Sequence, residues 1–140
     1  MKNLIKVLLV VSGLTGIIIG SGLLFAPVSF EASAGIDLGT NINLLSEVRA
    51  PGGALLVAGV LILLGAFITK LAYTSVLLSS LFYLSYGFSR LFSMIVDGVP
   101  SESLVTATIV EIVVGGLSFL VLVNFLKNQS QSDSALKITR

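Results

Sequence analysis

Four long apolar stretches constrain the possible folds of this chain more than any other feature of its sequence. The first stretch has no charged residue from Val7 to Phe30, and about 20 apolar residues are enough to cross the roughly 30 Å hydrocarbon core of a bilayer. Only 11% of the residues are charged, against roughly 25% in soluble domains. The sequence therefore predicts an all-α integral membrane four-helix bundle with antiparallel up-down topology. We expect its helices at about residues 4–26, 44–69, 71–96 and 102–126.

These helices are expected to form one transmembrane domain over residues 1–127, followed by a polar cytoplasmic tail over residues 128–140. A signal peptide is the alternative for the first stretch, because Lys2 and Lys6 precede it and Ala32-Ser33-Ala34 resembles a cleavage site. The apolar part is longer than the roughly 7–15 residues of a signal peptide. We therefore expect a membrane span.

Proline and glycine mark the boundaries of the second long helix and the connection before it. Pro51 disfavours helical geometry at Ala50, so this helix is expected either to kink or to start there. The polar connection before it contains a possible short interfacial helix from Val28 to Ala34, closed by Gly35. As the longest loop of the chain, this connection is the expected lid or partner-facing surface.

Small residues at helical spacing indicate where helices approach each other. Gly16 and Gly20 lie four residues apart, a spacing that permits close contact between transmembrane helices. The contact can lie inside the bundle or at a dimer interface, and the sequence leaves both open. The wider set of glycines could also dock onto a larger membrane complex; it comprises Gly13, Gly16, Gly20, Gly59, Gly115 and Gly116.

The composition excludes most catalytic chemistry. The chain has no Cys, His or Trp, so thiolate nucleophiles, disulfides and the commonest metal ligand are absent. No phosphate-binding loop or nucleophile–base pair is present, and we expect no enzyme activity, no cofactor and no bound metal. A net charge of +1 also argues against a nucleic-acid partner.

Two charged residues inside apolar stretches are the strongest candidates for a polar site. Arg90 lies in the third stretch and Glu111 is the only acid inside the fourth. At a rise of 1.5 Å per residue, Arg90 lies about 10 Å before Asp97, and Glu111 lies about 13 Å after Glu102. Their depths therefore match, and pairing removes much of the roughly 2.5–3.5 kcal/mol that a central charge costs. Alternatively, the long side chain of Arg90 extends outward to the interface.

Further polar residues could join this pair. Tyr83, Tyr86 and Asp97 share the helical face of Arg90. Glu47 and Arg49 enter the second helix on the same side of the membrane and could extend the pair into a network. Such a network can bind a polar ligand, or it can only fix the register of the helices.

The distribution of basic residues predicts the orientation. Six of them fall at one end of a four-span zigzag, and two fall at or near the other. Because positive residues accumulate on the cytoplasmic side, both termini are expected in the cytoplasm. The cytoplasmic set is Lys2, Lys6, Lys70, Lys127, Lys137 and Arg140.

The run from Ser46 to Gly53, SEVRAPGG, resembles the Glu-x-Arg motif and following Gly-Gly pair of the bacterial domain-of-unknown-function 4345 family. Arg90 with Asp97-Gly98, and Glu111 in the last helix, are similar to the rest of that family's pattern. Pro51 departs from the family's usual aromatic or aliphatic residue, which puts the start of the second helix in question. The resemblance implies a multi-pass, four-helix protein of a bacterial inner membrane and supplies no established activity. The layout is also similar to four-helix DoxX-like proteins, by architecture alone.

Three functions are compatible with these features. The leading hypothesis is a membrane protein that binds a lipid or another small amphipathic ligand, or a membrane partner, through the outer half of the bundle. The second is an accessory subunit that docks onto a larger membrane complex, or onto a second copy, through its glycine faces. The third is a small transporter, which is weakened by the single buried acid and the absence of an inverted repeat.

Overall fold

The computed structural model describes residues 3–138, with side chains described up to residue 128. Its elements are α1 (Asn3–Phe25), α2 (Pro27–Ser33), α3 (Ile42–Gly65), the 3-10 turn η1 (Thr69–Leu71), α4 (Ala72–Val96) and α5 (Glu102–Ile138). Over these residues every regular element is a helix, and four helices are long and apolar enough to cross a membrane. The predicted all-α class with four apolar helices is confirmed.

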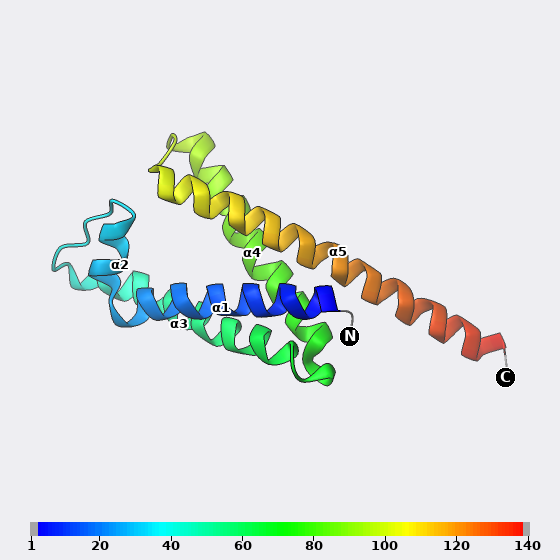
Figure 1. Cartoon of the computed structure of the whole chain (residues 1–140). Coiled ribbons are helices and arrows are strands. Elements are labelled where there is room, and N and C mark those ends of the chain that lie inside the picture. Colours follow the sequence, from blue (N-terminus) through cyan, green and yellow to red (C-terminus); the bar gives the residue numbers. More distant parts are fainter. Residues whose placement is uncertain (1–2, 139–140) are drawn as a thin grey trace.

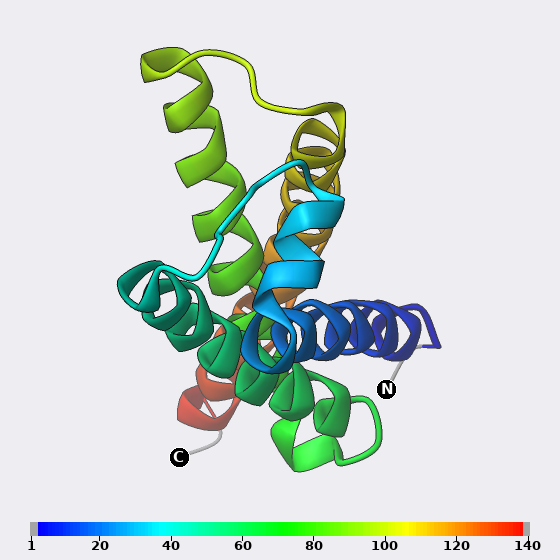
Figure 2. The same ribbon diagram turned by 90° about the vertical axis from the view of Figure 1, so that its left-hand side faces the viewer.

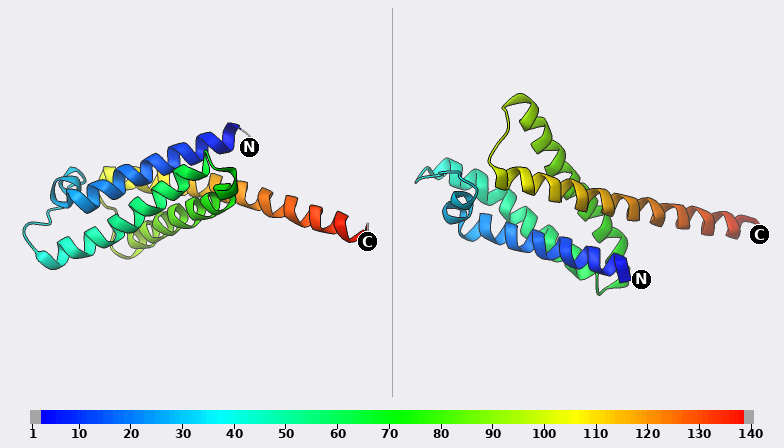
Figure 3. Two further views of the ribbon diagram at one scale, coloured as in Figure 1. Left: turned by 90° about the horizontal axis from the view of Figure 1, so that it is seen from below. Right: turned by 45° about the horizontal axis from the view of Figure 1, so that its top comes forward.

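The long helices form two hairpins (Figure 1). One consists of α1 and α3 and the other of α4 and α5, and α4 also packs on α3. The hairpins diverge toward the end that carries α2 and the α4–α5 turn, as the right-hand view of Figure 3 shows. Figure 2 shows α2 standing beside the start of α5 at this open end. The divergence leaves room between the hairpins that α2 partly covers.

Backbone contact through glycine holds α1 against α3. A Cβ at Gly16 would lie 3.1 Å from the Cα of Gly59, and one at Gly13 would lie 2.7 Å from the backbone nitrogen of Leu63. Gly20 likewise lies directly against Leu56. Inside a bilayer helices associate through van der Waals packing, which small residues allow. The close contact expected at Gly16 and Gly20 therefore lies within the chain.

Polar side chains connect α4 to all three other long helices. The Ser75 hydroxyl donates to the Leu61 carbonyl of α3 at 2.8 Å, and the hydroxyls of Ser79 and Ser118 on α5 lie 2.8 Å apart. The Tyr83 hydroxyl donates to the Ser12 carbonyl of α1 at 2.5 Å. These residues recur every four positions along α4, so one buried face makes all the contacts.

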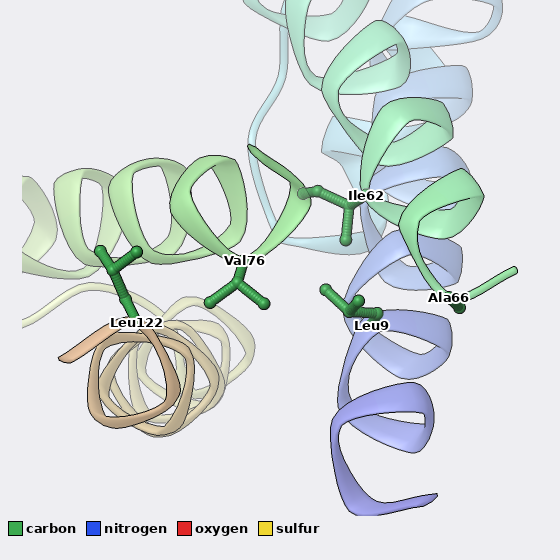
Figure 4. Close-up of a cluster of buried hydrophobic side chains, with 5 residues drawn as sticks. All are labelled: Leu9, Ile62, Ala66, Val76 and Leu122. Atoms are coloured by element: carbon green, nitrogen blue, oxygen red, sulfur yellow. The ribbon is translucent and has the colours of Figure 1, made fainter. Parts of the chain in front are cut away.

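The apolar core lies where the two hairpins meet. It contains Leu9, Ile62, Ala66, Val76 and Leu122, one or more from each long helix (Figure 4). Leu9 and Val76 are fully buried. This core joins the hairpins near the start of α1, at the end opposite α2.

Two helix boundaries differ from the expectation. First, α3 ends at Gly65 rather than near Thr69. It begins at Ile42, close to the expected residue 44 and ahead of the alternative start at Pro51, and the Asn41 side chain accepts hydrogen bonds from the backbone N–H groups of Asn43 and Leu44. Pro51 is tolerated inside α3 because the carbonyl that loses its donor belongs to Glu47, an exposed residue.

Second, α5 does not end near Leu126 but continues to Ile138. No Gly or Pro occurs between these residues to end the helix. The short helix expected before α3 is present as α2, and Gly35 follows it with a φ of 82°.

Candidate functional site

A cavity of about 550 Å³ lies between the hairpins at their open end. All five helices contribute to its wall, from Thr15 on α1 and Leu55 on α3 to Arg90 on α4. The wall is largely apolar, and its charged side chains are Arg90, Glu111 and Glu31. An apolar cavity of this size with a few polar groups is typical of a site for a small molecule.

Arg90 and Glu111 form the ion pair that the sequence predicts. The Nε of Arg90 lies 3.1 Å from Oε2 and 3.2 Å from Oε1 of Glu111. The Glu111 side chain is 13% exposed and that of Arg90 is 34% exposed. The pair forms because both residues lie about two turns from the α4–α5 connection, on helices that pack together.

The pair leaves hydrogen-bonding capacity unused. The Nε–H of Arg90 is directed at Oε1 of Glu111, so the buried Oε2 accepts no hydrogen bond despite its short distance to Nε. Among residues 3–128, neither Nη nitrogen of Arg90 donates to a protein group. Because Oε2 lies within the ion pair, the unused capacity is that of the Nη donors. The site is therefore incomplete as a purely structural ion pair.

Close contact between α4 and α5 positions this pair. A Cβ at Gly87 would lie 2.7 Å from Ile112, and one at Gly115 would lie 2.8 Å from Leu84. Glycine at these two places lets the helices approach closely next to the ion pair, on the side away from the α4–α5 turn. A larger side chain at Gly87 would separate α4 from α5 beside Arg90.

Tyr83 and Tyr86 also line the cavity. Tyr83 is 6% exposed, and its hydroxyl is bound to the Ser12 carbonyl, which fixes the ring between α1 and α4. Tyr86 lies one turn closer to Arg90 and is half-buried. The predicted grouping of these two tyrosines with Arg90 and Glu111 is present in the structure.

Three residues of the predicted set do not reach the cavity. Asp97 is exposed at the end of α4, where it accepts a hydrogen bond from Ser93 at 2.9 Å. Glu47 is exposed, and Arg49 donates through Nη1 to the Leu24 carbonyl. The expected extension of the ion pair to Glu47 and Arg49 is wrong, because carbonyls at the end of a helix lack an intrahelical donor and Arg49 binds one of them.

Arg49 and Gly52 instead connect α3 to the end of α1. Arg49 binds the Leu24 carbonyl. Gly52 lies directly against α1, because a Cβ there would lie 2.7 Å from the Leu23 side chain. Both contacts hold the last turn of α1 against α3. The arginine of the Glu-x-Arg motif and the first glycine after it thus have a packing role in this chain.

The sequence analysis expected the short helix α2 but missed that it brings Glu31 to the cavity. This helix folds back over α1, with the Phe30 ring against Gly22, and brings Glu31 to the cavity. The Ser101 hydroxyl donates to the Ala34 carbonyl at 2.9 Å, which ties the end of α2 to the α4–α5 turn. The sequence signal was Pro27 at the start of a short helix, but the direction of that helix depends on the contacts of Phe30 and Ala34.

A comparison with protein families matches most of this chain. Residues 4–122 match the family model described as Domain of unknown function (DUF4345). Comparisons with curated proteins and with solved structures found no match. The matched range covers most of the four apolar helices and includes the Arg49 contact and the Arg90–Glu111 pair. On this match, the chain belongs to the DUF4345 family.

Proposed function

We propose that this protein is a multi-pass protein of the bacterial inner membrane that binds a small amphipathic ligand in the cavity between its hairpins. The role is binding rather than catalysis. Four apolar helices support the membrane location, and their lengths suit a bilayer core of roughly 30 Å. The observation that carries the proposal is an incompletely bonded Arg90–Glu111 pair in the wall of a largely apolar cavity.

The proposed orientation places both termini in the cytoplasm and the cavity in the outer leaflet. The Lys6 ammonium lies 5.0 Å from the centre of the Phe67 ring, so the start of α1 lies beside the end of α3, close to Lys70. This basic end is opposite the cavity, which supports the positive-inside assignment. Lys2 and Arg140 lie outside the described residues, and the side chain of Lys137 is not described.

The geometry supports a ligand with an apolar body and a polar head. Arg90 has free N–H groups for a carbonyl or anionic oxygen, and Glu111 orients the guanidinium through Nε. The apolar wall accommodates a hydrocarbon chain, which can enter from the surrounding lipid. Binding of this kind needs only a few polar groups because the apolar contacts supply area while the polar groups supply orientation.

The glycine contacts do not support the alternative function, an accessory subunit that docks through its glycine faces. Gly13, Gly16, Gly20 and Gly59 contact the opposing backbone inside the α1–α3 hairpin, and Gly115 contacts Leu84. Gly116 is open, with no atom within 4 Å of a Cβ built on it. Five of the six glycines therefore form intrachain contacts rather than a free docking face.

Thermal unfolding of the purified protein in detergent, with and without single-chain amphiphiles, tests the proposal. A ligand at a hundredfold excess over its Kd stabilises the folded state by about 2.7 kcal/mol. We expect Ala107→Phe to abolish this stabilisation, because Ala107 lines the cavity and the larger ring fills it. Val113→Phe is the matched control on the same helix, since Val113 is 53% exposed and does not line the cavity.

A second variant tests the polar part of the site. We expect Arg90→Gln to weaken the stabilisation by amphiphiles with an anionic head. An identical ligand response in Arg90→Gln and wild type would remove Arg90 from the site. Stabilisation that survives Ala107→Phe unchanged would refute the cavity as the place of binding.

A further inference from the structure

The charges around the cavity restrict the chemistry of its ligand. One guanidinium, that of Arg90, and two carboxylates, those of Glu111 and Glu31, belong to residues that line the cavity. Glu111 is engaged by Arg90, whereas Glu31 forms no ion pair within the part of the chain whose side chains are described. The wall therefore carries one more negative than positive charge.

This balance disfavours a ligand with a single charge of either sign. A purely anionic head would reach the N–H groups of Arg90 but would bring a third negative charge beside two carboxylates. A purely cationic head would satisfy the carboxylates and leave the Nη groups of Arg90 without an acceptor. Like charges in a confined, poorly solvated site repel strongly because screening by water is weak there.

We propose that the ligand is an amphiphile whose head group carries both a phosphate and a primary ammonium. The phosphate accepts hydrogen bonds from the two Nη nitrogens of Arg90, a geometry for which the guanidinium fork is suited. The ammonium donates to the Glu31 carboxylate, while Glu111, whose Oε2 is buried, stays paired with the guanidinium. This assignment rests on the proposed function, because it names the head group of the amphiphile placed in the cavity.

Intrinsic tyrosine fluorescence can report ligand binding at this site. It has no Trp and three Tyr, and Tyr83 and Tyr86 line the cavity. Tyrosine emission of the full-length protein in detergent micelles can therefore follow titration with lyso-phospholipids of equal chain length. The probes are lyso-phosphatidylethanolamine, with phosphate and ammonium, and lyso-phosphatidylglycerol, with phosphate alone. Free phosphoethanolamine separates a lipid head from a water-soluble source of the same chemistry.

We expect wild type to bind the ethanolamine lipid about fivefold more tightly than the glycerol lipid, the upper range for one partly exposed charge pair. Glu31→Gln should reduce the difference to within about twofold, mainly through tighter binding of the glycerol lipid. Glu31 lies on α2, and its side chain forms no hydrogen bond or ion pair with residues 3–128. Glu47→Gln is the matched control, because Glu47 is exposed at the same end of the molecule and does not line the cavity.

The outcomes separate this inference from the proposed function. Equal or tighter binding of the glycerol lipid by wild type, or a preference that persists in Glu31→Gln, overturns the head-group assignment and leaves the binding function intact. Failure of both lipids to bind overturns the proposed function as well. Binding of free phosphoethanolamine as tight as that of its lipid supports the head-group chemistry and assigns it to a soluble ligand.

Discussion

Removing the two members of the Arg90–Glu111 pair should have unequal costs. Arg90→Met leaves the Glu111 carboxylate, which is 13% exposed, without a counter-charge. Glu111→Gln leaves the Arg90 guanidinium, which is 34% exposed and has a long side chain that can reach toward the interface. The more deeply buried partner therefore suffers more from the loss of the other.

The size of each effect follows from burial. An uncompensated charge inside a transmembrane helix costs about 2.5–3.5 kcal/mol, so we expect Arg90→Met to lower the free energy of unfolding by about 3 kcal/mol. The greater exposure of Arg90 reduces the expected cost of Glu111→Gln to about 2 kcal/mol. The double variant removes both charges. Its loss in free energy of unfolding should therefore be smaller than the sum of the two single losses by at least about 2 kcal/mol.

Equilibrium unfolding in mixed micelles, followed by the helical circular dichroism signal, measures these values in a double-mutant cycle. Glu47→Gln serves as the control because Glu47 is an exposed acid that forms no ion pair among the described residues. Additive single costs, or a larger cost for Glu111→Gln than for Arg90→Met, would show that the pair does not stabilise the hairpin as we argue.

Three further predictions concern packing and orientation. Gly59→Leu should lower stability by about 3 kcal/mol or more, because a Cβ there would lie 2.6 Å from the backbone nitrogen of Ile17; Gly116→Leu, at an open position on α5, should cause no loss in the same unfolding assay. Tyr83→Phe should cost about 1 kcal/mol through loss of the hydrogen bond to Ser12, and an unchanged midpoint would argue against that bond. Since the chain has no native Cys, Lys70→Cys and Asp97→Cys can be labelled singly with a membrane-impermeant maleimide. Only Asp97→Cys should react in intact spheroplasts, and the reverse pattern would invert the proposed topology.

The matching depths of Arg90 and Glu111 could be read from the sequence because depth along a helix is linear in residue number. Counting residues from the turn at Asp97 and Gly98 was enough to place both side chains at one level. The same counting failed for Glu47 and Arg49. Their level near the start of α3 was correct, but Arg49 binds the Leu24 carbonyl at the end of α1 instead of joining the ion pair.

The sequence by itself determined the all-α class, the number of apolar helices and the pairing of its two intramembrane charges, since the costs of burying charge and backbone in lipid leave few alternatives. Only the tertiary structure decided which faces meet, and that α2 folds over the cavity and adds Glu31 to it. Exposed apolar residues such as Leu4, Ile18 and Phe92 show the reason. A helix in a bilayer is apolar both on the face toward lipid and on the face toward the protein core, so hydrophobic periodicity does not reveal how the helix is rotated. Contacts of small residues and a few hydrogen bonds in the folded structure determine that rotation.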